Sequence, residues 1–364
     1  MSRELYVGLM SGTSLDGVDA VLADLAGARP KLIAEAHIPF NDPLRSELLG
    51  LNSRGDNEIE RVALAGNALA ARYAAAVAEV LARSKIPAAD IRAAGCHGQT
   101  VRHRPDRGYT IQIGNPALLA ELTGIRVVAD FRGRDVAAGG QGAPLAPAFH
   151  AAMFADPAED RVAVNLGGIA NLTFLPRGGA VTGFDSGPGN CLLDLWAARH
   201  LGKPHDPGGA WAAAGQAMPA LLERMLREPY FSAPPPKSTG RDLFNEGWLR
   251  DRLRGGEEAR AVQATLLELT ARSVADAVAR HCRGAHRLIV CGGGSKNDAL
   301  MRRLAALTSP AALEPSGHFG VDPQLVEATA FAWLAKQALE GRTGNLPSVT
   351  GARGARVLGA VYPK

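Results

Sequence analysis

Two apolar segments near the start of the chain, "ELYV" and "VDAVLADL", flank a turn of small, hydroxylated and acidic residues, "GLMSGTSLDG", from Gly8 to Gly17. Apolar and polar residues alternate after this turn, as they do in a half-buried strand. The pattern therefore predicts an opening hairpin. The next apolar stretch, "KLIAEAHIPF", predicts a further strand.

The rest of the first half changes between helical and extended patterns. Residues 59–81 are rich in Ala, with Arg and Glu on one side, which predicts a long helix. A short buried strand, "IRAAGC", is predicted to end at "HGQT". Residues 109–131 show a strand, helix and strand pattern, which we interpret as a βαβ unit with parallel strands. Glycines and prolines break every period in residues 132–147, and we expect the first domain boundary near this run.

The second half begins with a stretch, "RVAVNLGGIANLTFLP", that repeats the pattern of the opening. Each stretch is an apolar strand, a turn of Gly and short polar residues, and a second apolar strand, so the pattern predicts an internal duplication. A strand ending at Asp185, a helix from about Asn190, an exposed Pro-rich loop and three further helical stretches follow. Strands and helices that alternate in both halves predict α/β domains.

Composition limits the class of protein. A chain of 364 residues predicts about two domains, and 46% hydrophobic with 21% charged residues is ordinary for a soluble globular protein. The net charge of +4 comes without a Lys/Arg-rich run, which argues against a nucleic-acid partner. We expect a cytoplasmic protein, because the start lacks the apolar core of a signal peptide and Arg72 and Glu79 interrupt the most apolar helix.

The four cysteines lie far apart in the sequence and form no C-x-x-C pair. This spacing predicts neither a zinc site nor a disulfide framework, so we expect reduced thiols in the core.

Three glycine turns stand at predicted strand ends: "GLMSGTSLDG", "NLGGIAN" and "CGGGSKN". Ligands of α/β sheets bind beyond the carboxyl ends of strands, so the three turns can surround one ligand, and a nucleoside triphosphate would fit. The first turn is not a P-loop, because no Lys follows Gly12. The dinucleotide fingerprint fails as well, since its last position is Leu192 or Asn297. The alternative is that each turn is a tight bend without a ligand.

Asp185 in "FDSGPGN" is a candidate general base, because a strand end places it beside the N–H groups of a helix start. The alternative is that Asp185 caps its own turn. Glu327 begins a helix that is apolar nearly all round, and it either caps that helix or points into a cleft. His97 follows a buried strand and either contacts a ligand or satisfies a hydrogen bond in the core.

Four basic residues have a similar double interpretation. Arg132 and Arg134 can pair with neighbouring aspartates, or one of them can bind an anionic substrate through its planar guanidinium. Lys237 and Arg241 in "KSTGRD" can bind an anion or simply belong to a solvated loop.

With these motifs assembled, the chain resembles the anhydro-N-acetylmuramic acid kinases of bacterial peptidoglycan recycling. The resemblance runs nearly from end to end and rests on several long motifs in the right order, which are "GLMSGTSLDGVDAVL", "GCHGQTVRHRP", "QIGNPALLAELTGIRVVADFR", "GGQGAPLAPAFH", "VNLGGIANLT", "GFDSGPGNCLLD", "KSTGRDLFN", "CGGGSKN" and "VLGAVYP". The family often has Thr where Ser186 stands, a change that keeps the hydroxyl group.

The resemblance implies the two-lobed α/β fold of the sugar kinase, Hsp70 and actin superfamily, a duplicated ribonuclease H-like fold with an interlobe cleft. We expect residues 1–134 and about 348–364 in the first lobe and residues 135–347 in the second. ATP and Mg²⁺ are the implied cofactors, and relatives suggest a homodimer. A lysine is not required in the phosphate turn, because Mg²⁺ and backbone N–H groups can neutralise the transferring phosphoryl group.

The implied reaction opens the 1,6-anhydro bridge with water and phosphorylates O6, giving N-acetylmuramic acid 6-phosphate and ADP in peptidoglycan recycling and amino sugar catabolism. By the resemblance Asp185 is the catalytic base, and the sugar is bound by His97, Gly98, Arg132 and Glu327. The implied nucleotide-binding residues are Ser11, Gly12, Thr13, Ser14, Asp16, Gly17, Asp19, Asn165, Gly167, Gly168, Gly292, Gly293, Gly294 and Lys296. Whether Asp16, Asp19 or neither contacts Mg²⁺ stays open.

Two other functions compete with this one. A kinase of the same superfamily can act on an ordinary sugar hydroxyl, which Asp185 would then deprotonate in place of water. A nucleotide-dependent binding or regulatory module can share the same fold, because fold alone does not decide function.

Overall fold

The computed structural model describes residues 3–12, 14–27 and 29–364, and the chain divides into two compact units. Unit 1 comprises residues 1–153 and 325–364, and unit 2 comprises residues 154–324. The expected lobes, divided after residue 134 and near residue 348, differ from this division. Residues after 134 stay in unit 1 because the buried Asp135 carboxylate accepts hydrogen bonds from Gly142 N, Asn345 Nδ2 and Thr350 Oγ1 at 2.7, 2.6 and 2.8 Å.

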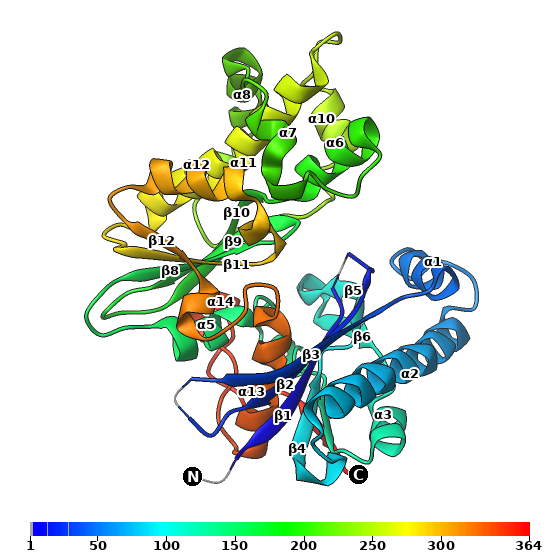
Figure 1. Ribbon diagram of the computed structural model, residues 1–364. Helices are drawn as coiled ribbons and strands as arrows, with labels where there is room; N and C mark the ends of the chain where they lie inside the picture. Colours follow the sequence, from blue (N-terminus) through cyan, green and yellow to red (C-terminus); the bar gives the residue numbers. More distant parts are fainter. Residues whose placement is uncertain (1–2, 13, 28) are drawn as a thin grey trace. The chain divides into compact units, whose positions relative to one another are not determined.

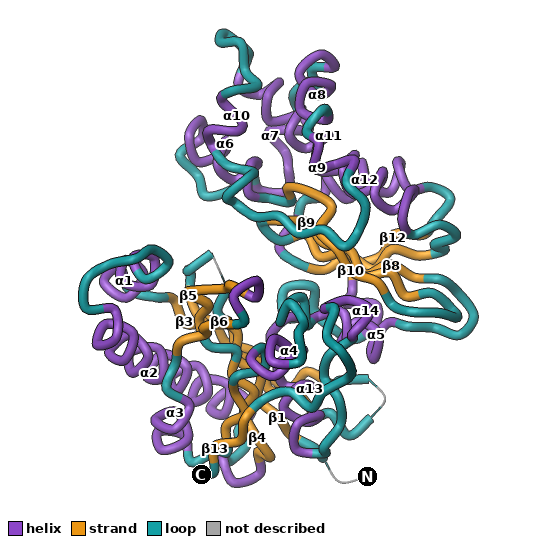
Figure 2. Tube along the Cα trace, turned by 180° about the vertical axis from the view of Figure 1, so that it is seen from behind, coloured by secondary structure: helices purple, strands orange, loops and turns teal. Residues whose placement is uncertain are grey.

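Unit 1 is a three-layer α/β structure (Figures 1 and 2). Its strands are β1 (Leu5–Met10), β2 (Gly17–Asp24), β3 (Lys31–Pro39), β4 (Ile91–Cys96), β5 (Gln99–Arg104), β6 (Tyr109–Ile113), β7 (Val127–Ala129) and β13 (Ala360–Tyr362). Its helices are α1 (Asp42–Gly50), α2 (Glu58–Ser84), α3 (Pro116–Thr123), α4 (Gly133–Ala137), α5 (Ala146–Phe154), α13 (Val326–Leu339) and α14 (Pro347–Thr350), with the last residue of α5 beyond the division.

The side chains of β1 show why helices cover both faces of the sheet. Leu5, Val7 and Leu9 pack with α2, whereas Tyr6 packs with α13 on the opposite face. Successive residues of a strand point to opposite faces, so an apolar run such as "LYVGL" requires a cover on each side.

Unit 2 has a sheet with helices packed on the face of Val162, Val164 and Leu166. Its strands are β8 (Arg161–Leu166), β9 (Ile169–Leu175), β10 (Thr182–Pro188), β11 (Arg287–Cys291) and β12 (Ala312–Pro315). Its helices are α6 (Cys191–Leu201), α7 (Ala210–Ala213), α8 (Pro219–Leu226), α9 (Pro229–Ser232), α10 (Glu246–Arg250), α11 (Ala259–His281) and α12 (Asp298–Thr308).

The two sheets share one topology over the described residues. The strand order is β13-β7-β4-β1-β2-β3 in unit 1 and β10-β9-β8-β11-β12 in unit 2. In each, three antiparallel strands of one meander are followed by two strands parallel to the first, and β13 adds one antiparallel strand at the edge of unit 1. The duplication predicted from the two hairpins is confirmed, and so is the duplicated α/β fold class.

The predicted βαβ unit over residues 109–131 is wrong. β6 pairs antiparallel with β5 in a separate two-stranded ribbon, and the parallel neighbour of β7 is β4. The periodicity identified the strands correctly, but partner choice depends on the neighbouring "HGQTVRHR" segment, which folds back on β6. The final strand returns to unit 1, as expected, and the four cysteines are buried. Across the described residues, no helix is both long enough and apolar enough to span a membrane.

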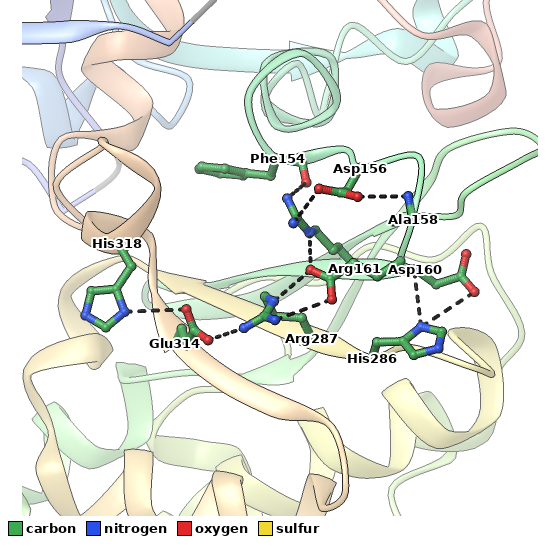
Figure 3. A network of polar contacts seen from close by, with 10 residues as sticks. Phe154, Asp156, Ala158, Asp160, Arg161, His286, Arg287, Glu314 and His318 are labelled. Carbon is green, nitrogen blue, oxygen red and sulfur yellow. Dashed lines mark hydrogen bonds and ion pairs between the residues drawn. The ribbon is translucent and has the colours of Figure 1, made fainter.

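A network of ion pairs crosses β8, β11 and β12 in unit 2 (Figure 3). Glu159 contacts both Arg161 Nε, at 2.7 Å, and Arg287 Nε, at 2.8 Å, and Arg287 also pairs with Glu314. Hydrogen bonds from the two guanidinium groups outweigh the effect of burial and lower the pKa of the Glu159 carboxyl to about 2. A charge shared by two arginines links the strands of this sheet.

Glu159→Gln should lower the free energy of unfolding by about 1.5 kcal/mol at pH 7, because a hydrogen-bonded ion pair is lost at a partly exposed site. A carboxyl whose pKa is lowered from 4.5 to about 2 stabilises the fold fully above pH 4.5 and loses this effect as the pH falls toward 2. Urea unfolding should therefore show the difference from wild type shrinking below pH 4.5. Glu223→Gln, which breaks an exposed pair with Arg227, is the control and should change stability little.

Candidate functional site

The turn between β1 and β2 is tied to the segment that follows β4. Ser11 is buried, and its hydroxyl group donates to Gly98 O at 3.2 Å and accepts from Tyr73 OH at 2.6 Å. Gln99 Nε2 donates to Gly12 O at 3.2 Å. The single hydroxyl proton of Ser11 is thus used inside unit 1, so this hydroxyl group has no further proton to donate to a ligand. Thr13, a predicted nucleotide contact, lies outside the described residues.

Two carboxylates follow in the same hairpin. Asp16 is exposed and accepts a hydrogen bond from Ser14 Oγ at 2.8 Å. Asp19 lies half-buried in β2 with Oδ1 2.8 Å from His37 Nδ1. Burial raises the pKa of Asp19 more than the bond with His37 lowers it. Gly17 has a packing role, because a Cβ atom there would lie 2.5 Å from the carbonyl oxygen of Ile38 on β3.

His97 and Arg132 form a connected pair in unit 1. The His97 ring is buried, and its Nδ1 lies 3.3 Å from Ser11 O, which can only accept. Its Nε2 lies 3.1 Å from Arg132 Nε and 3.0 Å from Arg132 Nη2, both of which can only donate. This network assigns the neutral tautomer with the proton on Nδ1. Burial, together with the positive charge of Arg132, lowers the pKa of His97 to about 3.

Arg132 pairs with neither of the neighbouring aspartates. Besides His97, it donates from Nη1 to Gly142 O at 2.8 Å. These bonds fix the plane of the guanidinium and leave one proton on each Nη atom for another acceptor. Arg134 is exposed.

Glu327 lies in the first turn of α13, near Arg132 and Asp19. Solvent reaches its side chain, and among the described residues it has no hydrogen bond or ion pair. The surrounding protein raises the pKa of the Glu327 carboxyl, the charge of Arg132 lowers it, and Asp19 raises it. Of the two alternatives for Glu327, capping is not observed, because no side-chain hydrogen bond caps the start of α13. The carboxylate is therefore open to a ligand.

Gly98 follows His97 at a position where the backbone requires glycine. Its φ of +76° is unusual for other residues, and a Cβ atom would come within 2.9 Å of Ile113 O. His97 and Gly98 also line a cavity of about 170 Å³, together with Asn115, Asp130 and Tyr362. Gly98 follows His97 in the chain, His97 is bonded to Arg132, and the charge of Arg132 acts on Glu327, so unit 1 brings together the four residues predicted to bind the sugar.

The two glycine turns of unit 2 meet at the carboxyl ends of the parallel strands β8 and β11. A Cβ atom on Gly292 would lie 2.4 Å from Asn165 Oδ1, and one on Gly294 would lie 2.6 Å from Leu166 Cβ. Gly293 and Lys296 are exposed, and Gly167 and Gly168 form the turn between β8 and β9. Arg241 is exposed and lies beside Gly168. Two of the three glycine turns therefore share one edge of the unit 2 sheet, because β8 and β11 are parallel neighbours.

The predicted surroundings of Asp185 need correction. Asp185 does not end its strand, because β10 continues to Pro188 with an irregular pairing between Asp185 and Gly187. Three N–H groups that lead into α6 are engaged within the protein and are not open to an anion. Those of Gly189, Asn190 and Cys191 donate to the carbonyl oxygens of Gly167 and Gly168 at 2.8–3.0 Å. The start of α6 holds the β8–β9 turn in place of an anion.

A loop distant in sequence holds Asp185 instead. Thr239 N donates to Asp185 Oδ2 at 2.9 Å, and Tyr230 OH donates to the backbone carbonyl of Asp185 at 2.8 Å. Burial raises the pKa of the Asp185 carboxyl, while bonds from Thr239 and Ser238 and the charge of Lys237 lower it. The alternative that Asp185 caps its own turn is not what the structure contains. No short motif around Asp185 could have indicated these partners, since Thr239 lies 54 positions away.

A family model, anhydro-N-acetylmuramic acid kinase, matches residues 4–364. The chain belongs to the anhydro-N-acetylmuramic acid kinase family. A family member from Nitrosospira multiformis is 52% identical over 365 residues and covers 100% of both chains. Another, from Burkholderia orbicola, is 56% identical over 368 residues and covers 99% of this chain and 96% of that one. The family assignment predicted from the motifs is confirmed.

Among solved structures, the activator of the 2-hydroxyisocaproyl-CoA dehydratase from Clostridium difficile, with bound ADPNP, is similar with a TM-score of 0.48 and 14% identity. The similarity covers 92% of this chain and 97% of that chain.

The neutral state of His97 in this member of the kinase family predicts a pH-dependent stability. A histidine whose pKa falls from 6.5 to about 3 on folding stabilises the fold fully above pH 6.5, and this effect decreases as the pH falls, because the unfolded chain takes up a proton. Between pH 6.5 and 5, wild type should lose up to about 1.4 kcal/mol per pH unit relative to His97→Gln. Urea unfolding of both proteins at several pH values tests this, and parallel curves would contradict the neutral assignment.

Proposed function

We propose that the chain uses ATP to open the anhydro ring of 1,6-anhydro-N-acetylmuramic acid and to phosphorylate its O6, in cell-wall recycling and amino sugar catabolism. Membership of the kinase family over residues 4–364 carries the proposal. The chemistry of the side chains gathered in each unit supports it. The finer assignments of base, sugar contacts, nucleotide contacts and metal contacts are part of the same proposal.

The reaction joins a hydrolysis to a phosphoryl transfer. The oxygen of water forms a bond to the anomeric carbon C1 while the bond from C1 to O6 breaks. The freed O6 forms a bond to the γ-phosphorus as the bond from that phosphorus to ADP breaks. One proton of the water stays on the new anomeric hydroxyl, and the other leaves to a base. The products are N-acetylmuramic acid 6-phosphate and ADP.

Asp185 is the proposed base. Inverting hydrolysis of a glycoside normally requires an acid for the leaving oxygen and a base for the water. Here the phosphoryl group takes the place of the acid's proton, so one carboxylate suffices. Hydrogen bonds and the charge of Lys237 favour the ionised form that a base requires, and burial moves the pKa toward the working range.

Arg132 and Glu327 are the proposed sugar contacts, and His97 and Gly98 are proposed to line the same pocket. The free Nη protons of Arg132 can donate to an anionic or hydroxyl oxygen of the sugar, and the Glu327 carboxylate can accept from a hydroxyl group. His97 has both ring nitrogens engaged, so its contribution is to hold Arg132. The hydrogen bonds to His97 Nε2 and Gly142 O make this guanidinium a fixed point for the substrate.

The proposed nucleotide contacts come from both duplicated hairpins and from the turn after β11. They are Ser11, Gly12, Thr13, Ser14, Asp16, Gly17 and Asp19 in unit 1, and Asn165, Gly167, Gly168, Gly292, Gly293, Gly294 and Lys296 in unit 2. Backbone N–H groups of such turns suit phosphate oxygens. The unit 2 turns fit this role because Gly293 and Lys296 are exposed and a ligand can approach the backbone at Gly293 closely.

Mg²⁺ fits the acidic groups of the first hairpin. No group of three or more His, Cys, Asp or Glu side chains suited to a metal occurs among the described residues. Mg²⁺ bound with ATP needs only one or two carboxylates beside phosphate oxygens and water, and Asp16 and Asp19 offer these. When bound, the ion would neutralise charge on the phosphates. The homodimer and the cytoplasmic location stay predictions.

The testing experiment uses the purified protein with Mg-ATP and 1,6-anhydro-N-acetylmuramic acid in ¹⁸O-labelled water. Borohydride quenching at early times fixes the oxygen on C1 before exchange with solvent, and N-acetylmuramic acid alone measures that exchange. We expect a product that carries one phosphoryl group and one ¹⁸O atom on C1. A phosphorylated product that has gained no water would favour the alternative of a kinase that acts on an ordinary sugar hydroxyl group. ATP-dependent binding without a product would favour the regulatory module.

A further inference from the structure

The segment Lys237–Thr239 contacts both the backbone and the side chain of Asp185. Asp185 N donates to Lys237 O at 3.1 Å, as if the segment extended the edge of β10. Thr239 N then donates to Asp185 Oδ2 at 2.9 Å, and the neighbouring Ser238 side chain favours the ionised form of the carboxyl group. Tyr230, at the start of the same loop region, binds the Asp185 carbonyl oxygen. The continuous segment 230–239 therefore contacts both the backbone and the carboxylate of Asp185.

Lys237 adds a fixed positive charge. Its Nζ donates to Tyr230 O at 3.1 Å and Phe231 O at 3.4 Å, and it lies 4.7 Å from the centre of the Tyr230 ring. An ammonium group held by two carbonyl oxygens and a ring stays near Asp185 without pairing directly with it. The alternative considered for Lys237, a lysine in a solvated loop, therefore does not describe this residue.

We propose that Lys237, Ser238 and Thr239 are positioning residues that hold the Asp185 carboxylate ionised and in one orientation toward the attacking water. The inference rests on the proposed role of Asp185 as base. The hydrogen bond from Thr239 N restricts the rotation of the carboxylate about the Cβ–Cγ bond, so the oxygen that accepts the proton of the water keeps one direction. Pre-orientation of a reacting group lowers the entropic part of the barrier to reaction.

The titratable and charged groups around Asp185 and Lys237 come from three elements. Tyr230 lies on α9 and Lys237 on the loop. Burial and the charge of Arg280 on α11 lower the pKa of Lys237, and burial and the charge of Lys237 lower the pKa of His281 on the same helix. Of the groups named, Ser238 is the one that acts on the Asp185 carboxyl group through an uncharged side chain, so it can be replaced without removing a charge.

Ser238→Ala tests the inference through the pH dependence of kcat/KM for the sugar. Removing a donor to the ionised carboxylate should raise the apparent pKa of the acidic limb by about one unit, a loss of about tenfold below that limb. Ser232→Ala is the matched control, because Ser232 lies in the same region and its hydroxyl group donates to Pro229 O. It should leave the profile unchanged. Thermal unfolding of both variants verifies that they are folded.

Lys237→Gln is the second variant, and it should shift the same limb in the same direction by removing the positive charge. Asp185→Asn is measured beside them. Loss of turnover in Asp185→Asn together with unshifted limbs in Ser238→Ala and Lys237→Gln would overturn the positioning role and leave the base assignment intact. Normal turnover in Asp185→Asn would overturn the base assignment itself. An acidic limb that shifts in Ser238→Ala and Lys237→Gln but not in Ser232→Ala supports the inference.

Discussion

Asp185→Asn should lower kcat by about a thousandfold while leaving ATP binding nearly unchanged. A positioned general base contributes about 10²–10⁴ to rate, and an amide of the same shape cannot accept the proton of the water. The amide still has an oxygen that can accept from Thr239 N, so the loop should stay in place. Steady-state assays of sugar phosphorylation measure the rate, and calorimetric titration measures ATP binding.

The control for this variant is Asp251→Asn. Asp251 follows α10 of the same unit, is exposed and pairs with Arg250. The same change of charge at that position should leave kcat within about twofold, because exposed ion pairs contribute little. Activity of Asp185→Asn close to wild type would mean that another group or the solvent takes the proton.

Gly95→Ala should destabilise unit 1 by about 3 kcal/mol or prevent folding. A Cβ atom on Gly95 would lie 2.0 Å from the Phe331 carbonyl oxygen, and one on Gly8 would lie 1.9 Å from the Ala328 carbonyl oxygen. Both obstacles are backbone atoms of α13, so no side chain can rotate away. The helix would have to separate from the sheet with its buried residues, and overpacking of this kind costs about 1–3 kcal/mol or more.

The same variant connects packing with the site. Glu327 lies in the first turn of α13, beside Ala328, so a displaced helix moves the Glu327 carboxylate away from Arg132. If Gly95→Ala still folds, the KM for the sugar should rise several-fold. Gly178→Ala is the control, since Gly178 is exposed and a Cβ atom there meets nothing within 4 Å. Equal unfolding curves for the two variants would contradict the close-packing account.

Local patterns predicted most of the elements and the family. The helices α2, α11 and α13 and the strands of both hairpins follow from period and composition, because each element must bury its own apolar face. The predicted hairpin repeat is confirmed in the strand order of both sheets, since a meander pairs neighbours in sequence. Long motifs with glycine at fixed positions identified the family, because close backbone approaches tolerate no other residue there.

Tertiary structure decided which elements meet. The periodicity of β6 indicates a strand but contains no information on whether β5 or β7 pairs with it. Residues 135–153 belong to unit 1 through the hydrogen bonds of the buried Asp135 with Asn345 and Thr350, groups more than 200 positions away. A boundary drawn from glycines and prolines records where regular structure stops, and packing continues past that point.

The sequence by itself determined the chemical groups of this protein: a carboxylate in "FDSGPGN", an arginine in "DFRGRD", a histidine in "CHGQT" and three glycine turns. Only the tertiary structure decided what each group does with its hydrogen bonds. His97 holds Arg132 across 35 positions, and Asp185 is held by Thr239 across 54. The physical reason is that hydrogen-bond partners are chosen by distance in space, and periodicity reports which face is buried without saying what covers it.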